Sequence, residues 1–411
     1  MPAPVPRLGM KAVFGPGFSL STEDDEYQFQ FHNLTQVDSR NYLETADAPF
    51  QTFRTTFGLP RQWWIFSGRL TKPFEYYVVP AFGFDSLNLL DAFLNIHFDD
   101  RIQIKIGRYK TPFTYEFYNL PINALINPER SLFFNNFGLN RDVGIMAWGQ
   151  MFDKRLDYAV GIFNGSRNFY IDRNDAKDLA AFINWRPFGA WEDTPLENWN
   201  IGGSVNATNN LQVPVPNPLR DNVATTGSSF FGVPFLTFNS NVREDGPQIF
   251  WSLHSAYYYN HLSVIGEWQS GFEDYGTVPN LAFKTKVPVE SFYVQIGYFL
   301  TGERVASRGQ VRPIRNFDLR PGKFGLGAIE PAFRYNYLHL GEQVFNGGLA
   351  DPNLWSNKAQ LIDLGFNWYW TTYVKLYLGW QHGVYGEPVL IQPGRRQLTS
   401  DLLWARFQIL F

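Results

Sequence analysis

The stretch RIQIKIGRYKTPF, residues 101–113, alternates between apolar and polar side chains at its start. One parity carries isoleucine at 102, 104 and 106, and the other carries the cations Arg101 and Lys105. A β-strand turns successive side chains to opposite faces, so this segment predicts a strand with one apolar and one cationic face. In a soluble sandwich the apolar face would meet a protein core. In a membrane barrel it would meet lipid, and the cations would meet a water-filled lumen.

The same alternation recurs from Tyr27 to the end of the chain, in segments separated by Gly, Pro, Asn and Asp clusters. The clearest segments are 92–98, 142–149, 157–163, 333–337 and 373–381. No apolar run of about 18 residues and no long helical periodicity is visible. The chain therefore predicts an all-β fold of antiparallel strands joined by hairpins.

The two faces of these segments decide between a sandwich and a barrel. One face carries charged and amide side chains, which a dry core would not accept. The other carries aromatic residues near strand ends, Tyr335, Tyr337, Trp368 and Trp370, where an interfacial belt would lie. Aromatic residues make up 18% of the chain, and the mean hydropathy of −0.25 agrees with strands that turn half of their residues to a polar lumen. The predicted fold is a transmembrane antiparallel β-barrel.

The composition excludes several classes of function. The 411 residues hold 35 Lys and Arg against 38 Asp and Glu, a balance that does not suggest a nucleic-acid partner. The chain has no cysteine, which rules out disulfides, thiolate metal sites and cysteine nucleophiles. The six histidines form no HExxH motif, and neither a Gly-x-Ser-x-Gly elbow nor a Walker loop is present. We therefore expect no catalysis and no cofactor.

Both ends of the chain carry signals. The last residues, ARFQILF, place Phe407, Ile409 and Phe411 on one face, which resembles the signal by which outer-membrane barrels are recognised for assembly. The alternative is an ordinary closing strand. The start, MPAPVPRLGM, is rich in proline and has no apolar h-region, so we expect a leader to precede it. We expect an extended segment at 1–18 and a single barrel domain at 19–411.

Several motifs, in order along the chain, resemble the phosphate-selective porin family of the O and P type. They are GRYKTPFTYE at 107–116, INPERSL at 126–132, LNRDVGIMAWG at 139–149, YAVGIFNG at 158–165, GAIEPAFRYNYL at 327–338 and LGFNWYW at 364–370. The resemblance covers nearly the whole chain. It implies a sixteen-stranded barrel in the outer membrane, in contact with lipid and assembled as a homotrimer. It also implies a loop folded inward to narrow the pore.

The inward loop implied by the resemblance is residues 114–140. The charged residues in it and at its flanks are the predicted constriction site: Lys110, Glu116, Glu129, Arg130 and Arg141. Residues of lumen parity are the predicted wall charges: Arg101, Lys105, Arg334, Lys375 and Arg406. Lysine and arginine in a narrow site replace part of an anion's water shell, and arginine can bind phosphate in a bidentate way. The alternative for each residue is a solvated charge without an ordered ligand.

The resemblance supports a channel more strongly than it supports phosphate. The family's selective members carry an arginine-rich eyelet, and the matching region here, FRTTFGLPRQWW at 53–64, holds only Arg54 and Arg61. We predict a porin for passive diffusion of small hydrophilic solutes, with a preference for anions such as phosphate. The alternative is a structural barrel that anchors surface-layer or envelope partners through its Pro-rich start and long loops.

One loop resembles a cation site. The stretch DRNDAKD carries Asp172, Asn174, Asp175 and Asp178, at spacings somewhat like those of a calcium loop. It lacks the glycine and the distal glutamate of an EF-hand. We favour an Asx-rich turn and expect no metal.

Overall fold

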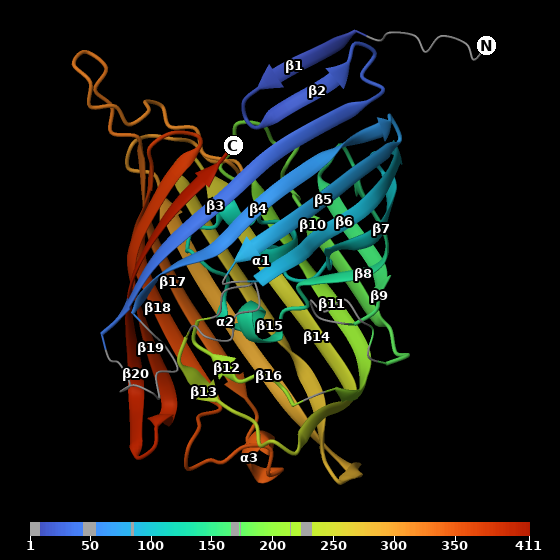
Figure 1. Ribbon diagram of the computed structural model, residues 1–411, viewed down its shortest axis with the longest axis vertical. Coiled ribbons are helices and arrows are strands. Elements are labelled where there is room, and N and C mark those ends of the chain that lie inside the picture. Colours follow the sequence, from blue (N-terminus) through green and yellow to red (C-terminus); the bar gives the residue numbers. More distant parts are fainter. Residues whose placement is uncertain are drawn as a thin grey trace.

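The computed structural model describes residues 9–43, 55–83, 86–165, 172, 174–213, 215–222 and 232–411. Over these residues the chain forms a closed antiparallel β-barrel of sixteen strands (Figure 1). In chain order the barrel strands are β3 (Gln28–Tyr42), β4 (Thr56–Thr71), β5 (Phe74–Gly83), β6 (Ser86–Asp99), β7 (Ile102–Lys110), β8 (Arg141–Met151), β9 (Leu156–Phe163), β10 (Asp178–Trp185), β11 (Trp199–Val213), β14 (Val242–Tyr259), β15 (Leu262–Thr277), β16 (Asn280–Tyr298), β17 (Ala328–Leu340), β18 (Lys358–Tyr369), β19 (Val374–Gln392) and β20 (Arg395–Leu410). Each strand pairs with the next, and β20 pairs back to β3, which closes the sheet. The predicted fold class and strand number are confirmed.

The alternation in the sequence becomes the two faces of the wall. In β7, Ile102 and Ile106 are 57% and 43% exposed on the outer face, whereas Gln103 between them is 4% exposed. In β17, Arg334 and Asn336 are buried on the inner face. An apolar outer belt around a polar interior is the pattern that a lipid bilayer requires of a barrel.

The start of β3, the first barrel strand, and the C-terminus lie at the same end of the barrel, which we call the terminal rim (Figure 1). Before the barrel, β1 (Met10–Phe14) and β2 (Phe18–Thr22) form a hairpin, and β2 pairs with the first residues of β3. This hairpin crosses the boundary predicted at residue 18, and the closed sheet begins at β3. Residues 1–8 of the predicted N-terminal segment lie outside the described residues.

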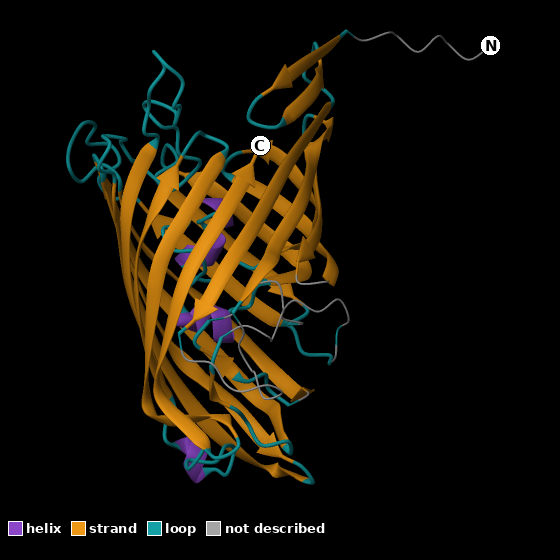
Figure 2. Cartoon of the chain, turned by 60° about the vertical axis from the view of Figure 1, so that its left-hand side comes forward, coloured by secondary structure: helices purple, strands orange, loops and turns teal. Residues whose placement is uncertain are grey.

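The remaining elements are short and lie in connections between barrel strands (Figure 2). Between β7 and β8 lie α1 (Tyr115–Tyr118), the 3₁₀ turn η1 (Ile122–Ala124) and α2 (Leu132–Phe137). Between β11 and β14, β12 (Leu219–Arg220) pairs with β13 (Pro234–Leu236). The helix α3 (Gln343–Asn346) lies between β17 and β18. In the described part of the chain, no helix has the length and apolar character needed to cross a membrane.

Candidate functional site

The connection between β7 and β8, residues 111–140, contacts the inner face of many strands. The Tyr115 backbone N–H donates to Glu267 Oε1 of β15 at 2.7 Å, and Lys375 Nζ of β19 donates to the Leu125 carbonyl at 2.9 Å. Ser204 of β11 accepts a hydrogen bond from the Thr114 N–H of the segment. The side chains of three further wall residues donate to carbonyls of the segment: Arg334 of β17, Asn367 of β18 and Arg406 of β20. Figure 2 shows the short helices of this segment surrounded by strands. Side chains from several sides of the barrel thus hold the segment in place.

Glu116 and Ser131 fix the internal fold of this segment. Ser131 is the N-cap of α2, and its hydroxyl accepts a hydrogen bond from the Phe134 N–H at 3.4 Å. The Glu116 carboxylate accepts hydrogen bonds from the Ser131 N–H, at 3.0 Å, and from the Ser131 hydroxyl. Burial raises the pKa of Glu116 above its ordinary value, although the Ser131 hydrogen bonds and the Arg334 charge act against this. Glu116, predicted at the constriction, therefore bonds to its own loop.

Five buried charges, which we call the paired cluster, join the segment to the wall. They are Asp38, Arg40, Arg61, Glu129 and Arg406, each 3% exposed or less. Arg61 donates to both oxygens of Glu129, at 2.7 and 2.6 Å, and Arg406 donates to Glu129 Oε1 at 2.7 Å. Arg406 and Arg40 also donate to Asp38, at 2.6–3.1 Å. Burial acts to raise the pKa of Glu129, but the charges of Arg61 and Arg406 hold it below its ordinary value.

The predicted wall cations Arg334 and Lys375 are also engaged. Arg334 Nε lies 2.9 Å from Asp363 Oδ2, and Arg334 Nη1 donates to the Glu129 carbonyl at 2.6 Å. Lys375 Nζ, besides its bond to Leu125, lies 5.1 Å from the ring centre of Tyr369. These two and Arg406 have the predicted parity but bind protein groups, so they serve to anchor the segment.

Two cavities follow the inner face of β4–β8. One, of about 500 Å³, is lined by Lys105, Lys110, Arg130 and Arg141 together with two carboxylates, Asp91 and Asp157. Four cations against two carboxylates leave its lining with a formal charge of +2. The other, of about 370 Å³, lies toward the terminal rim. Four residues line both cavities: Tyr77, Phe93, Lys105 and Trp148.

Three of these cations, Lys105, Lys110 and Arg130, form no ion pair with any described residue; we call them the unpaired trio. Lys110 Nζ donates to the carbonyls of Phe117 and Leu120, at 2.8 and 3.3 Å. Arg130 donates to the Glu116 and Leu120 carbonyls, at 3.2 and 3.4 Å. Carbonyls satisfy the donors without offsetting the positive charge, and the carboxylates that act on these cations, Glu116 and Asp91 among them, do so without a direct ion pair.

Lys105 is held by aromatic rings. Its Nζ lies 4.6 Å from the ring centres of Phe93 and Trp148 and 5.5 Å from that of Tyr109. Phe117 similarly lies beneath Lys110 and Arg130, 5.2 and 4.9 Å from the two charged groups. Ring faces attract cations electrostatically without removing their charge. Phe93, Trp148 and Phe117 were not predicted as site residues, although the alternation in 92–98 and 142–149 places Phe93 and Trp148 on the polar face.

Arg141 and Arg101 lie in different settings. Arg141 lines the larger cavity, but its Nε lies 3.1 and 3.0 Å from the two oxygens of Asp91, so its charge is offset.

Arg101 was predicted on the lumen wall, and the structure corrects this. It lies in the turn between β6 and β7, 75% exposed and paired with Asp99, because the chain reverses there before the alternation of β7 begins. Arg54, in the matched eyelet region, lies outside the described residues.

The C-terminal residues lie on the outer face. Phe407 is 5.9 Å from Trp370 between ring centres, and Phe411 is 6.3 Å from Phe31. Ile409 pairs with Thr35 and Val374. Their role as an assembly signal stays a prediction.

The carboxylates of the DRNDAKD loop have separate partners. Asp172 pairs with Lys177, and Asp178 accepts a hydrogen bond from Asn206 at 3.1 Å. Asp172 and Asn174 accept from the backbone N–H groups of Asn174 and Ala176, which is the pattern of Asx turns. Asp175 lies between these turns. Within the described ranges, no group of three or more His, Asp or Glu side chains could hold a metal.

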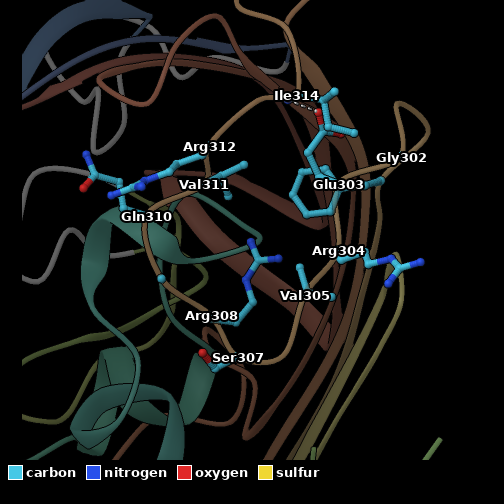
Figure 3. A pocket seen from close by; sticks show the side chains of 12 residues that line it. Gly302, Glu303, Arg304, Val305, Ser307, Arg308, Gln310, Val311, Arg312 and Ile314 are labelled. Carbon is cyan, nitrogen blue, oxygen red and sulfur yellow. Dashed lines mark hydrogen bonds between the residues drawn. The ribbon is translucent and has the colours of Figure 1, made fainter. Parts of the chain in front are cut away.

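A third cavity, of about 560 Å³, lies within the connection between β16 and β17 at the terminal rim (Figure 3). Its lining comes from residues 299–314, with Arg308 pointing into the middle and Arg304 pointing away (Figure 3). Arg308 is paired with Glu330 of β17. This cavity is separate from the two that follow β4–β8.

The comparisons with known proteins agree with this architecture. Residues 235–385 match the family Phosphate-selective porin O and P. The resemblance that the motifs indicated is thereby confirmed over the C-terminal part of the chain. A protein of Caulobacter vibrioides described as uncharacterized is 28% identical over 152 residues, which are 36% of this chain and only 28% of that protein.

Solved porins share the fold. The anion-selective porin from Comamonas acidovorans superimposes with a TM-score of 0.52 at 10% identity, over 94% of this chain and all of that one. Salmonella typhi OmpF, in complex with daunomycin, gives a TM-score of 0.55 at 10% identity, over 98% of this chain and all of that one. Loop-deleted OmpT, an outer membrane protein of Vibrio cholerae, gives 0.53 at 8% identity, over 94% and 100%. The chain has the barrel fold of these outer-membrane porins, and the family match over residues 235–385 together with this fold supports an outer-membrane channel.

Proposed function

We propose that this porin passes small hydrophilic solutes by passive diffusion and prefers anions, phosphate among them. The observation that carries the proposal is the unpaired trio, three cations that line one cavity and form no direct ion pair with a described residue. A charged lining inside a low-dielectric wall raises the local concentration of the opposite ion. Solutes of either sign would diffuse down their gradients, and anions would spend more time at the site.

We further propose that residues 111–140 are the constriction. The segment supplies Arg130, which lines the larger cavity together with Lys105 and Lys110 of β7. Its hydrogen bonds to side chains of six barrel strands hold it in place. A fixed, narrow and cationic passage would sort solutes by size and charge without any gating motion.

Reversal potentials in a salt gradient test the anion preference. The purified porin in planar bilayers should give a reversal potential on the anion side. Replacing Lys105 with Gln should lower the anion-to-cation permeability ratio by up to about fivefold, since one charge acting at about 4 Å in water contributes about 1 kcal/mol. Lys286→Gln is the matched control, because Lys286 also lies over a ring, 4.0 Å from the centre of Phe272, but on the outer face.

A cation-selective wild type, or equal effects of the two substitutions, would remove the anion claim. Phosphate needs its own measurement. If phosphate dwells at the trio, millimolar phosphate should reduce the chloride current of the wild type and reduce it less in Lys105→Gln. An undiminished chloride current would limit the proposal to small anions in general.

We also propose that the porin assembles as a homotrimer through one sector of its outer face. Most outward positions of β5–β18 at mid-height are apolar, whereas β19, β20, β3 and β4 turn polar groups outward. Asp401 there accepts hydrogen bonds from Trp380 Nε1, at 2.8 Å, and from the His382 ring, at 2.9 Å. The other outward polar side chains of this sector lie on β3 and β4 and are Asn33, Thr35, Ser39, Asn41 and Gln62. Polar and ionisable groups are costly against lipid, so this sector is better covered by a second copy of the chain.

Cross-linking tests the trimer and its surface. The chain lacks cysteine, so a single Asn41→Cys variant can be treated with a bis-maleimide and sized in mild detergent. We expect covalent dimers from Cys at 41 and a particle mass of three chains. Leu253→Cys, an exposed apolar position of β14, is the control and should stay uncross-linked. A single-chain mass, or cross-links only from 253, would overturn the proposal.

A further inference from the structure

Residues 299–327, between β16 and β17, lie partly inside and partly outside the wall at the terminal rim. Inside, Arg308 pairs with Glu330 and donates to the Ala124 carbonyl at 3.1 Å. Outside, the ring of Phe317 lies 5.0 and 5.4 Å from those of Trp368 and Trp370. Trp368 shares the outer face of β18 with exposed Leu364 and Phe366. The segment therefore passes over the rim and returns along the lipid-facing side.

The outer part is an ordered hairpin, residues 317–326, which we call the rim hairpin. Asp318 and Gly325 exchange backbone hydrogen bonds at 3.1 and 3.0 Å. The Arg320–Pro321–Gly322–Lys323 turn between them closes with the Lys323 N–H donating to the Arg320 carbonyl, and Gly322 has φ +76°. Proline followed by a residue of positive φ is the signature of a type II turn. The sequence thus builds a tight, pre-formed tip.

Two hydrogen bonds fix the rim hairpin against the aromatic cluster of the outer face. Trp368 Nε1 donates to the Leu326 carbonyl at 2.7 Å, and the Phe317 N–H donates to the Trp370 carbonyl at 2.7 Å. Tryptophan at the edge of an apolar belt marks the level of lipid headgroups. The hairpin therefore lies at headgroup level and continues the lipid-contacting surface.

The free surface of the rim hairpin combines apolar and cationic groups. Leu319, Phe324 and Leu326 are 69%, 60% and 51% exposed. Lys323 at the tip and nearby Arg315 are exposed and form no ion pair with described residues, whereas Arg320 is paired with Asp318. Large apolar side chains beside free cations are what an interfacial segment presents to an anionic lipid surface. A purely aqueous setting would leave the three apolar side chains without a partner.

We propose that the rim hairpin is a lipid-binding site: Leu319, Phe324 and Leu326 enter the interface, and Lys323 and Arg315 bind the phosphate groups of anionic phospholipids. The occupant is the leaflet at the terminal rim, because the hairpin is continuous with the aromatic cluster that faces the bilayer. This inference does not depend on the ion preference of the channel. It concerns the outer surface, which is separated by the wall from the unpaired trio.

A fluorescent probe tests this contact. A single Phe324→Cys variant labelled with a nitrobenzoxadiazole group is reconstituted in vesicles of phosphatidylcholine with increasing phosphatidylglycerol. We expect the emission to shift to shorter wavelength as phosphatidylglycerol rises. Lys323→Gln in the labelled protein should lower the ratio of docked to undocked hairpin about fivefold, the usual effect of one cation near an anionic surface. Lys286→Gln, an exposed lysine near the opposite rim, should leave the emission unchanged.

Two further measurements distinguish binding of lipid headgroups from binding of free phosphate. Inorganic phosphate added to the detergent-solubilised protein should not shift the emission, because the hairpin binds headgroups at a surface and not free anions. Mass spectrometry of lipids that co-purify with the unlabelled protein should show phosphatidylglycerol enriched in the wild type and depleted in Lys323→Gln with Arg315→Gln. Emission that stays water-like in all vesicles, or equal shifts with and without phosphatidylglycerol, would overturn the proposal. So would an unchanged lipid ratio in the double variant.

Discussion

The paired cluster and the unpaired trio both hold cations inside the same barrel, arginine among them in each case, yet these cations have opposite settings. Arg61 donates to Glu129, and Arg406 donates to Glu129 and Asp38, all at 2.6–2.7 Å, and both arginines are almost fully buried. Lys105 lies over aromatic rings, forms no ion pair with a described residue and lines two cavities. A cation paired with a carboxylate stabilises the fold, whereas a cation without such a pair contributes to the electrostatic potential that ions meet in the passage. The difference lies in the partner and not in the residue type.

The largest expected effect is on the paired cluster. Glu129→Gln removes the carboxylate between Arg61 and Arg406 and leaves two buried cations with too few anions. Breaking a buried pair in this way costs about 3–5 kcal/mol of unfolding free energy. Urea unfolding of the reconstituted barrel measures it. Asp318→Asn, which breaks an exposed pair, is the control and should cost less than about 1 kcal/mol. Similar midpoints for Glu129→Gln and wild type would mean that the cluster is not structural.

The pH dependence sharpens the same point. The folded-state pKa of Glu129 lies below its unfolded value, so its contribution is complete above about pH 4.3 and is lost as the pH falls toward the folded pKa. The unfolding free energy of the wild type should therefore decline on acidification below this point. Glu129→Gln should decline less steeply over the same range. Parallel pH profiles would show that Glu129 is not the linked group.

A smaller effect is expected at the aromatic contacts of Lys105. Trp148→Leu removes a ring whose centre is 4.6 Å from Nζ, a contact of about 0.5–2 kcal/mol. The charge stays in the cavity but loses its fixed position. Single-channel records should show noisier current with the anion preference kept. Loss of the preference in Trp148→Leu would mean that the position of the charge, and not its presence, decides selectivity.

The smallest effect belongs to Arg101. It is 75% exposed and its partner Asp99 lies in the same turn, so Arg101→Gln should change the unfolding free energy by less than about 1 kcal/mol. Its reversal potential should equal that of the wild type. A change in reversal potential as large as that of Lys105→Gln would show that the Arg101 charge acts on ions in the passage.

Much of the fold could be predicted from the alternation, and less of the site. Parity alone assigns Ile102 to the outer face and Lys105 to the inner face, because the period of a strand is fixed. Parity also places Arg334 and Arg406 inward, but not the carboxylates that neutralise them. Arg406 meets Asp38 across 368 positions, through the closure of β20 on β3. Such partners depend on strand register and on the path of residues 111–140, which a single sequence does not contain.

The turn positions show the other limit. Arg101 continues the alternation of β7 in the sequence, yet the chain reverses at that point and the alternation has no meaning there. The aromatic setting of Lys105 is similar, since Phe93 and Trp148 have the right parity but become neighbours only through the pairing of β6, β7 and β8. The alternation within one strand predicts which face of the wall a side chain lies on, whereas the pairing register between strands decides which side chains it contacts.

The most direct test compares a paired and an unpaired cation in one cavity. Reversal potentials should be measured for Lys105→Gln and for the double variant Asp91→Asn with Arg141→Gln, which removes an ion pair from the same lining. We predict that Lys105→Gln lowers the anion-to-cation permeability ratio by up to about fivefold and that the double variant leaves it unchanged, since its formal charge is unchanged. An equal fall in both, or no fall in Lys105→Gln, would contradict the account.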